Sequence, residues 1–217
     1  MAVDPYAPFS SARLVYRAIE DNDEDDDFID LIQKNPLSVA GSSIFLHRPQ
    51  SRQMSMKGYK ASLLGNKLLA VFICLRPAAP EEGQDRPAPP TPIGIIALDD
   101  SGGAERHHRE ADLGIDIAGP YQGKGYGGEA IEWTLRWGFR TAGLHRVGLG
   151  AFSYNERAVA LYQRLGFVIE GRRREAIWYE DGWHDGILMS ILEHEWRERQ
   201  KASAGEGEKK VTAIVSR

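Results

Sequence analysis

The most informative segment of the chain is EADLGIDIAGPYQGKGYG, at residues 110–127. Apolar side chains alternate through its first half, at Leu113, Ile115 and Ile117, and predict a strand over 110–118. The second half is rich in glycine and leads into a pattern that is typical of a helix over 127–142. Because the first N–H groups of a helix have no partner within it, such a junction forms an anion site. We therefore expect a phosphorylated ligand at this loop.

The loop residues suit that ligand. Glycine has no Cβ, so the backbone can bend sharply here and approach a phosphate closely. Lys124 adds a positive charge. The loop residues that we expect to bind the ligand are Gln122, Gly123, Lys124, Gly125, Tyr126 and Gly127.

Three kinds of loop share this composition. From Gly123 the sequence satisfies the dinucleotide fingerprint G-x-G-x-x-G, but residues 133–155 contain no acid that could bind the ribose. A nucleoside-triphosphate loop needs Ser or Thr after its lysine, and Gly125 stands there instead. The third pattern, Q-x-x-G-x-G, is met by Gln122, Gly125 and Gly127. It resembles the pyrophosphate loop of the GNAT superfamily, the acetyl-CoA-dependent N-acetyltransferases.

The resemblance extends from Glu110 to Leu192. The segment NERAVALYQRLGF at 155–167 resembles the N-x-x-A and L-Y-x-x-x-G-F element of these enzymes, and the residues from Trp183 resemble their closing strands. Within the superfamily, the strand and loop look most like those of spermidine acetyltransferases and ribosomal-protein N-terminal acetyltransferases. The first 65 residues contain no motif that matches.

The resemblance implies the fold and the cofactor site. The expected fold class is α/β (α+β), a GNAT-like acyl-CoA N-acyltransferase fold. It has a twisted, mostly antiparallel sheet of six or seven strands, flanked by about four helices. Acetyl-CoA would be the co-substrate, and Ile115, Ile117 and Asn155 would join the loop as cofactor-binding residues. Backbone N–H groups on the strand at 113–118, beside a strand that splays away, would polarise the thioester carbonyl.

Acetyl transfer to an amine also needs an acid and a base. The resemblance implies that Tyr162 protonates the departing thiolate, and the alternative is an ordinary core aromatic. Asp112 and Glu110 lie on one face of the strand and are the candidate bases, unless they are surface or ion-paired carboxylates. Ser153 and Glu156 have capping-box spacing, which would leave Asn155 free for the ligand.

Composition limits the remaining possibilities. The chain has 217 residues, which predicts one domain over 1–196, with its acetyl-CoA-binding part at 110–192 and a disordered tail at 197–217. The net charge of −4 gives no reason to expect nucleic-acid binding. No spacing of His, Cys and carboxylates suggests a metal site. The single cysteine, Cys74, is expected in a buried strand.

The location and assembly of the protein follow from weaker signals. The first residues form no secretory signal pattern, and no stretch reaches the length of a membrane span, so we expect a cytoplasmic protein without a membrane partner. Whether the protein forms a homodimer is left open by the sequence.

The remaining periodicity predicts the other elements. Eight acids lie within residues 20–30, and we interpret them as a solvated loop and the acidic start of a helix over 26–34 that ends at Pro36. The alternative is a patch that attracts a polycationic acceptor. The other expected helices cover 51–64 and 155–165, and residues 76–92, with six prolines, form a loop. The other expected strands cover 13–19, 67–75, 92–98, 146–152, 172–179 and 183–192.

These expectations lead to one function and two alternatives. The expected function is transfer of an acetyl group from acetyl-CoA to a primary amine, by direct attack in a ternary complex. The amine could be a polyamine, a protein N-terminus or a small molecule. The first alternative is a non-catalytic acyl-CoA-binding regulatory module. A nicotinamide-dependent oxidoreductase is disfavoured by the missing acid after the loop.

Overall fold

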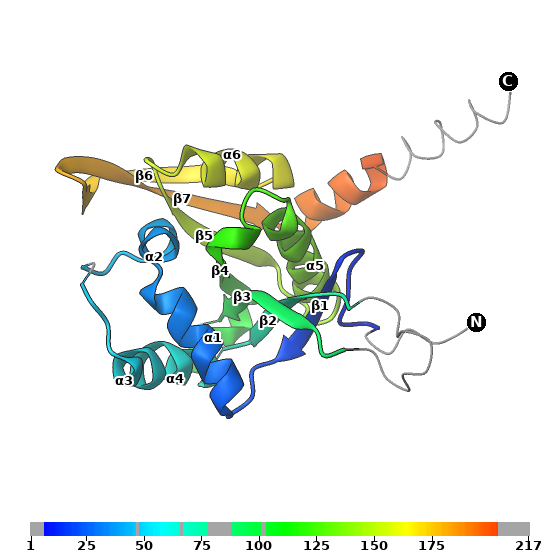
Figure 1. The fold of residues 1–217 in the computed structure, drawn as a ribbon. Helices are drawn as coiled ribbons and strands as arrows, with labels where there is room; N and C mark the ends of the chain where they lie inside the picture. The colour runs from blue at the N-terminus through cyan, green and yellow to red at the C-terminus, as the bar shows by residue number, and fades with distance from the viewer. Residues whose placement is uncertain (1–6, 47, 66, 78–87, 101–102, 204–217) are drawn as a thin grey trace, which may run out of the picture.

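The computed structural model describes residues 7–203, except for 47, 66, 78–87 and 101–102 (Figure 1). Most of the loop expected over 76–92 therefore lies outside the described residues. The first part of the chain forms β1 (Leu14–Ala18), α1 (Asp23–Lys34), α2 (Pro36–Ser42), α3 (Arg52–Met54), the π-helix η1 (Ser55–Lys60) and α4 (Ala61–Leu64). The sheet continues with β2 (Leu69–Leu75), β3 (Thr91–Asp99) and β4 (Glu110–Ile117), with a short 3-10 helix, η2 (Gly103–His108), before β4.

The second part of the chain completes the sheet. After β4, the short 3-10 helix η3 (Gly119–Tyr121) leads to α5 (Tyr126–Arg140), β5 (Arg146–Phe152) and α6 (Glu156–Leu165). The hairpin of β6 (Val168–Tyr179) and β7 (Gly182–Leu192) follows, and residues 193–203 form a last helix. The strand order is β1-β2-β3-β4-β5-β7-β6, and this seven-stranded sheet is antiparallel except for the parallel pair β4–β5. The expected fold class is confirmed.

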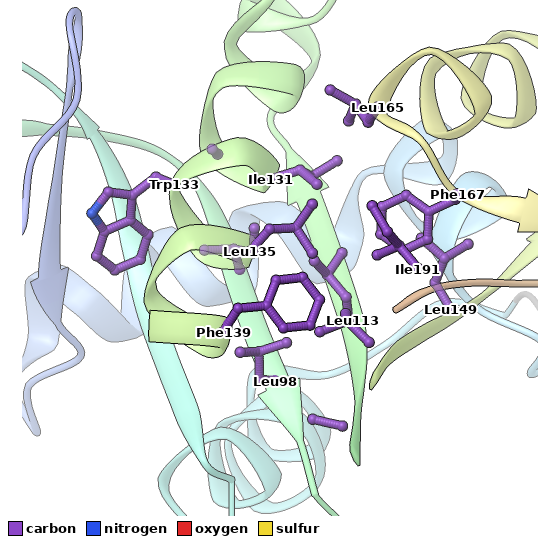
Figure 2. Packing of buried hydrophobic residues seen from close by; sticks show 14 of the residues in the cluster. Leu98, Leu113, Ile131, Trp133, Leu135, Phe139, Leu149, Leu165, Phe167 and Ile191 are labelled. Carbon is purple, nitrogen blue, oxygen red and sulfur yellow. The ribbon is translucent and has the colours of Figure 1, made fainter. Parts of the chain in front are cut away.

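Helices cover both faces of the sheet, and β2 shows why. Successive side chains of a strand point to opposite faces. Val71 and Ile73 pack into the core beneath α5, whereas Phe72 and Cys74 pack against α1 and α4. Figure 2 shows the first of these cores, where Leu135 and Phe139 of α5 meet side chains of the sheet.

Cys74 is fully buried, as expected, and burial raises the pKa of its thiol to about 11. A thiol in that state is not a nucleophile at neutral pH. Among the described helices, none is long and apolar enough to cross a membrane.

The N-terminal helices differ from those expected. Pro36 ends α1, but it also begins α2, which was not predicted; Asn35 caps this helix by accepting from the N–H groups of Leu37 and Ser38. The helix expected over 51–64 is divided by the π-helix η1. At the other end of the chain, the helix over 193–203 continues past the predicted boundary at 196, and Trp196 is buried against Phe139.

Candidate active site

The site lies where β4 and β5 separate. Their parallel pairing is confined to Glu110–Asp112 on β4 and Arg146–Gly148 on β5. Beyond that point β4 keeps its pairing with β3, up to Ile117, while β5 stays paired with β7. A cavity of about 580 Å³ lies at the divergence, lined by residues of β4, the glycine-rich loop, α2 and α6. The splayed strand implied by the resemblance is therefore present.

Most of the predicted cofactor-binding residues line this cavity. Those that do are Ile115, Ile117, Gln122, Gly123, Gly125, Tyr126, Gly127 and Asn155. Lys124 does not; its ammonium lies 5.7 Å from the ring centre of Tyr121.

The loop has the backbone geometry that the sequence suggested. Gly123 and Gly125 have φ angles of +79° and +83°, in the left-handed region that favours glycine, and Gly125 is the N-cap of α5 without a side-chain cap. The side chain of Arg13 donates to the carbonyl of Lys124 at 3.0 Å and forms an ion pair with Glu129 at 2.7 Å. Arg13, the residue before β1, therefore connects the loop to the first turn of α5.

Two further cations face this part of the cavity. Arg157 and Arg164 of α6 both line it, and a Cβ placed on Gly123 would lie 3.5 Å from the guanidinium of Arg157. The sequence did not predict a binding role for either arginine, because neither is one of the motif positions in α6. Together with the open N-terminus of α5, they provide positive charge for an anionic ligand.

Asn155 caps α6, contrary to the capping-box expectation. Its side-chain oxygen accepts from the N–H of Ala158 at 3.2 Å. The hydroxyl of Ser153 instead accepts from the backbone N–H of Asp185 at 2.9 Å, across to β7. Asn155 still lines the cavity, so its amide nitrogen can donate to a ligand while its oxygen caps the helix.

Tyr162 lies on α6 and lines the same cavity. Its ring packs edge-on against Phe167, with 5.9 Å between the ring centres. Burial raises the pKa of the phenol to about 12, with the charge of Asp116 contributing, so the hydroxyl is protonated at neutral pH. The position suits a proton donor inside the cavity.

The two predicted bases lie elsewhere. Glu110 and Asp112 belong to the paired end of β4, opposite Arg146 and Gly148, and neither lines the cavity. The structure therefore does not bring them together with Tyr162.

The carboxylate that does line the cavity is Asp116, which sequence reasoning missed. It is 9% exposed, and the hydroxyl of Tyr59 donates to it at 3.4 Å. Burial raises the pKa of this carboxyl to about 6, although hydrogen bonds from Ser42 and Tyr59 act in the opposite direction. The signal in the sequence was its even spacing from Glu110 and Asp112 on one strand face.

Aromatic side chains close one side of the cavity. Tyr154, which follows β5, donates from its hydroxyl to the carbonyl of Ala40 on α2 at 2.7 Å. Its ring stacks on that of Tyr179 of β6, with 4.5 Å between the ring centres. In Figure 1 the β6–β7 hairpin extends beyond the other strands, above α2. The hairpin and the unpredicted helix α2 therefore form this wall together.

Two groups that could suggest other chemistry have structural roles. His184 packs edge-on against Tyr154, with 5.0 Å between the ring centres, and Asp185 forms an ion pair with Arg172 at 3.0 Å. Within the part of the chain that is described, no group of His, Cys, Asp and Glu could hold a metal ion.

The chain is similar to several named acetyltransferases. The chain is 31% identical over 94 residues to a spermidine N(1)-acetyltransferase of Escherichia coli (strain K12), covering 43% of this chain and 50% of the relative. It is 31% identical over 103 residues to a putative ribosomal N-acetyltransferase of Bacillus subtilis (strain 168), covering 48% and 55%. These alignments span about half the length of both relatives.

A solved structure is similar over a longer range. A spermidine N-acetyltransferase from Vibrio cholerae, solved with CoA and spermine, superposes with a TM-score of 0.67 and 26% identity, over 85% of this chain and 98% of that one. The model of the acetyltransferase (GNAT) domain family matches residues 13–168, which include the glycine-rich loop, Asp116 and Tyr162. The chain belongs to the GNAT acetyltransferase family.

Proposed function

We propose that this protein transfers the acetyl group of acetyl-CoA to a primary amine, by direct attack within a ternary complex. The observation that carries the proposal is the cavity at the divergence of β4 and β5, because the glycine-rich loop and Tyr162 both line it. One cavity thus combines an anion site with a proton donor. The solved relative with CoA and spermine supports the same pairing of ligands.

The glycine-rich loop would hold the pyrophosphate of acetyl-CoA. The left-handed glycines and the uncapped N-terminus of α5 leave N–H groups for the phosphate oxygens. Arg157 and Arg164 add charge at the same side. Asn155 and the apolar side chains of Ile115 and Ile117 would contact the pantetheine arm.

The splayed end of β4 would activate the thioester. Beyond Asp112, the side of β4 that faces β5 has no strand pairing in the described structure. Backbone N–H groups there can donate to the thioester carbonyl as it becomes an oxyanion. Tyr162 would then donate its proton to the departing thiolate.

The charges around the cavity favour an acceptor with one amine over a polyamine. Asp116 is the one carboxylate that lines the cavity in the described structure, so it can neutralise one ammonium. Four of the six acids of α1 are engaged by cations of the protein: Asp25 by Arg17, Asp26 by Lys60, Asp27 by Arg52 and Asp30 by Lys34. A protein N-terminus or a small amine therefore fits the charge of the site better than spermidine.

The regulatory-module alternative predicts a different use of the same cavity. Such a module needs the loop to bind acyl-CoA but needs no acid at the sulfur. Tyr162 inside the cavity therefore supports catalysis over simple binding.

An amine screen tests the proposal. Release of free thiol from acetyl-CoA would be followed with spermidine, short peptides with free N-termini, and small monoamines. We expect turnover with at least one single-amine class and weaker turnover with spermidine. Acetyl-CoA binding, seen as a higher melting temperature, without thiol release in any reaction would instead identify a binding module.

A further inference from the structure

Asp116 differs from four acids of α1, which pair with cations of the described chain, whereas Asp116 does not. Asp25 pairs with Arg17, and Asp27 and Asp30 pair with Arg52 and Lys34. Asp116 is buried, yet no lysine, arginine or histidine of the described chain forms an ion pair with it. A buried carboxylate is costly unless it is paired with a cation. The cavity beside it leaves room for a cation from a ligand.

The strand geometry places Asp116 opposite the acetyl-CoA side. Ile115 and Ile117 pack toward the core beneath α5, which is the face that carries the glycine-rich loop and α6. Because side chains alternate along a strand, Asp116 points to the other face, where Tyr59 of η1 and Ser42 of α2 hydrogen-bond to it. The cavity is lined by residues of both faces, so Asp116 and the glycine-rich loop border one space.

We propose that Asp116 binds the ammonium group of the acceptor and removes its proton before the attack on the thioester. The inference rests on the proposed function and assigns to Asp116 the base role that sequence analysis gave to Asp112 or Glu110. A carboxylate with a pKa raised to about 6 is ionised at neutral pH and is a stronger base than an ordinary aspartate.

The proton balance of the step is complete. The ammonium gives one proton to the Asp116 carboxylate, which later releases it to solvent. The free amine forms the C–N bond at the thioester carbonyl, and the C–S bond breaks when the intermediate collapses. Tyr162 gives its proton to the sulfur and regains one from the nitrogen, so the products are the amide, CoA thiol and one proton.

The surroundings of Asp116 make its titration identifiable. Tyr59 of η1 donates a hydrogen bond to Asp116, and the charge of Asp116 also acts on Tyr162 of α6, which lines the same cavity. Ser42 of α2 does not titrate. The pKa of Tyr162 is raised to about 12 by burial, and burial likewise raises that of Tyr59 well above its ordinary value. A rate limb near pH 6 therefore cannot come from either tyrosine.

The test is the pH profile of kcat/KM for the wild type, Asp116→Asn and Asp112→Asn, with an amine found in the screen. The wild-type profile should rise through a limb at about pH 6. Asp116→Asn should lower kcat by roughly 10²–10⁴ and abolish that limb, while its acetyl-CoA affinity stays at the wild-type level. An Asp116→Asn enzyme with a wild-type profile would overturn the inference. So would loss of the limb in Asp112→Asn alone, which would return the base role to the paired end of β4.

A second variant is independent of any damage at Asp116 itself. Tyr59→Phe keeps the ring but removes a hydrogen bond that lowers the Asp116 pKa. The acidic limb should therefore move to higher pH in this variant, and an unmoved limb would contradict the inference. Wild-type enzyme that turns over no amine would overturn the proposed function together with this inference, whereas an active wild type with unmoved profiles overturns the inference alone.

Discussion

The two ends of β4 carry carboxylates on the same face but in different surroundings. At one end, Asp112 lies opposite Gly148 on the paired strand β5 and beside Arg146. At the other end β5 has diverged, and Asp116 lines the cavity beside two hydroxyl groups, with no ion pair to any described cation. The four-residue step between them, about 13 Å along a strand, separates a carboxylate on the closed part of the sheet from one inside the cavity.

This difference shows that strand divergence, more than residue type, decides which acid of β4 borders the cavity. Pairing fills the space beside Asp112 with backbone, and a Cβ on Gly148 would already lie 2.5 Å from its carboxylate oxygen. Divergence leaves a cavity beside Asp116, where we propose that the acceptor binds. We call the paired end of β4, at Asp112, the closed end, and the end beside the cavity, at Asp116, the open end. Experiments can test the contrast between these two ends, and the largest effect comes first.

The largest effect is expected at Tyr162, on the open side. Tyr162→Phe keeps the ring and its contact with Phe167 but removes the proton that the thiolate would take. The kcat should fall by roughly 10²–10⁴, with little change in acetyl-CoA affinity. Steady-state kinetics together with a binding titration measures both quantities. Near-wild-type turnover would mean that Tyr162 is only a packed aromatic and that the open end lacks its proton donor.

Asp116 should also make the free energy of unfolding depend on pH. Its carboxyl has a pKa of about 6 when folded, against 3.8 ordinarily, so the folded state holds the proton where the unfolded chain has released it. Stability contributed by this group is present below about pH 4 and is lost as the pH rises through about 6, a loss of ~3 kcal/mol for a shift of two units.

Asparagine does not titrate, so Asp116→Asn should gain stability relative to the wild type by that amount between about pH 4 and pH 7.5. Urea unfolding at each pH measures the difference. Parallel stability curves for the two proteins would show that burial does not raise the pKa of Asp116.

The sequence predicted the secondary structure at the open end, which comprises β4, the glycine-rich loop and α5, because the signals for these elements are local. The alternation in β4, the glycines of the loop and the helix pattern after them each involve neighbouring residues. Gly166, the glycine of the quoted motif, ends α6 in the left-handed conformation that glycine favours.

What the sequence could not predict depends on contacts between distant segments. Glu110, Asp112 and Asp116 share a strand face, and nothing local says where β5 departs. Ser153 has the spacing of a helix cap, but its hydroxyl instead accepts a hydrogen bond from the backbone N–H of Asp185, which is distant in sequence. The Asn35-Pro36 pair was interpreted only as the end of α1, although an N-cap residue before proline is also a typical helix start.

The anion site at the open end can be tested at Gly127. Its φ angle is not positive, and a Cβ there would lie 3.8 Å from the side chain of Ile117, so a side chain fits without strain. Gly127→Asp puts a negative charge at the N-terminus of α5, where the helix dipole would otherwise attract the phosphate. The new carboxylate would repel the phosphate from that position. Acetyl-CoA affinity should fall by about tenfold or more, whereas Gly127→Ala, with the same Cβ and no charge, should lose less. Equal affinities for the two variants would show that the loop does not bind phosphate.

The smallest effect is expected from the acids of α1. Asp25, Asp26 and Asp27 are paired with cations of the protein, whereas Asp23 and Glu24 of the first turn form no ion pair with any described residue. If these two acids attracted a polyamine, neutralising them would slow spermidine turnover, and salt would have the same effect. The charge pattern instead predicts that Asp23→Asn combined with Glu24→Gln leaves the rate with spermidine within about twofold and nearly independent of salt. The double variant should lose a little thermal stability, because acids in the first turn of a helix interact favourably with its dipole. A steep loss of spermidine turnover would show that an exposed acidic helix, and not the buried Asp116, selects the acceptor.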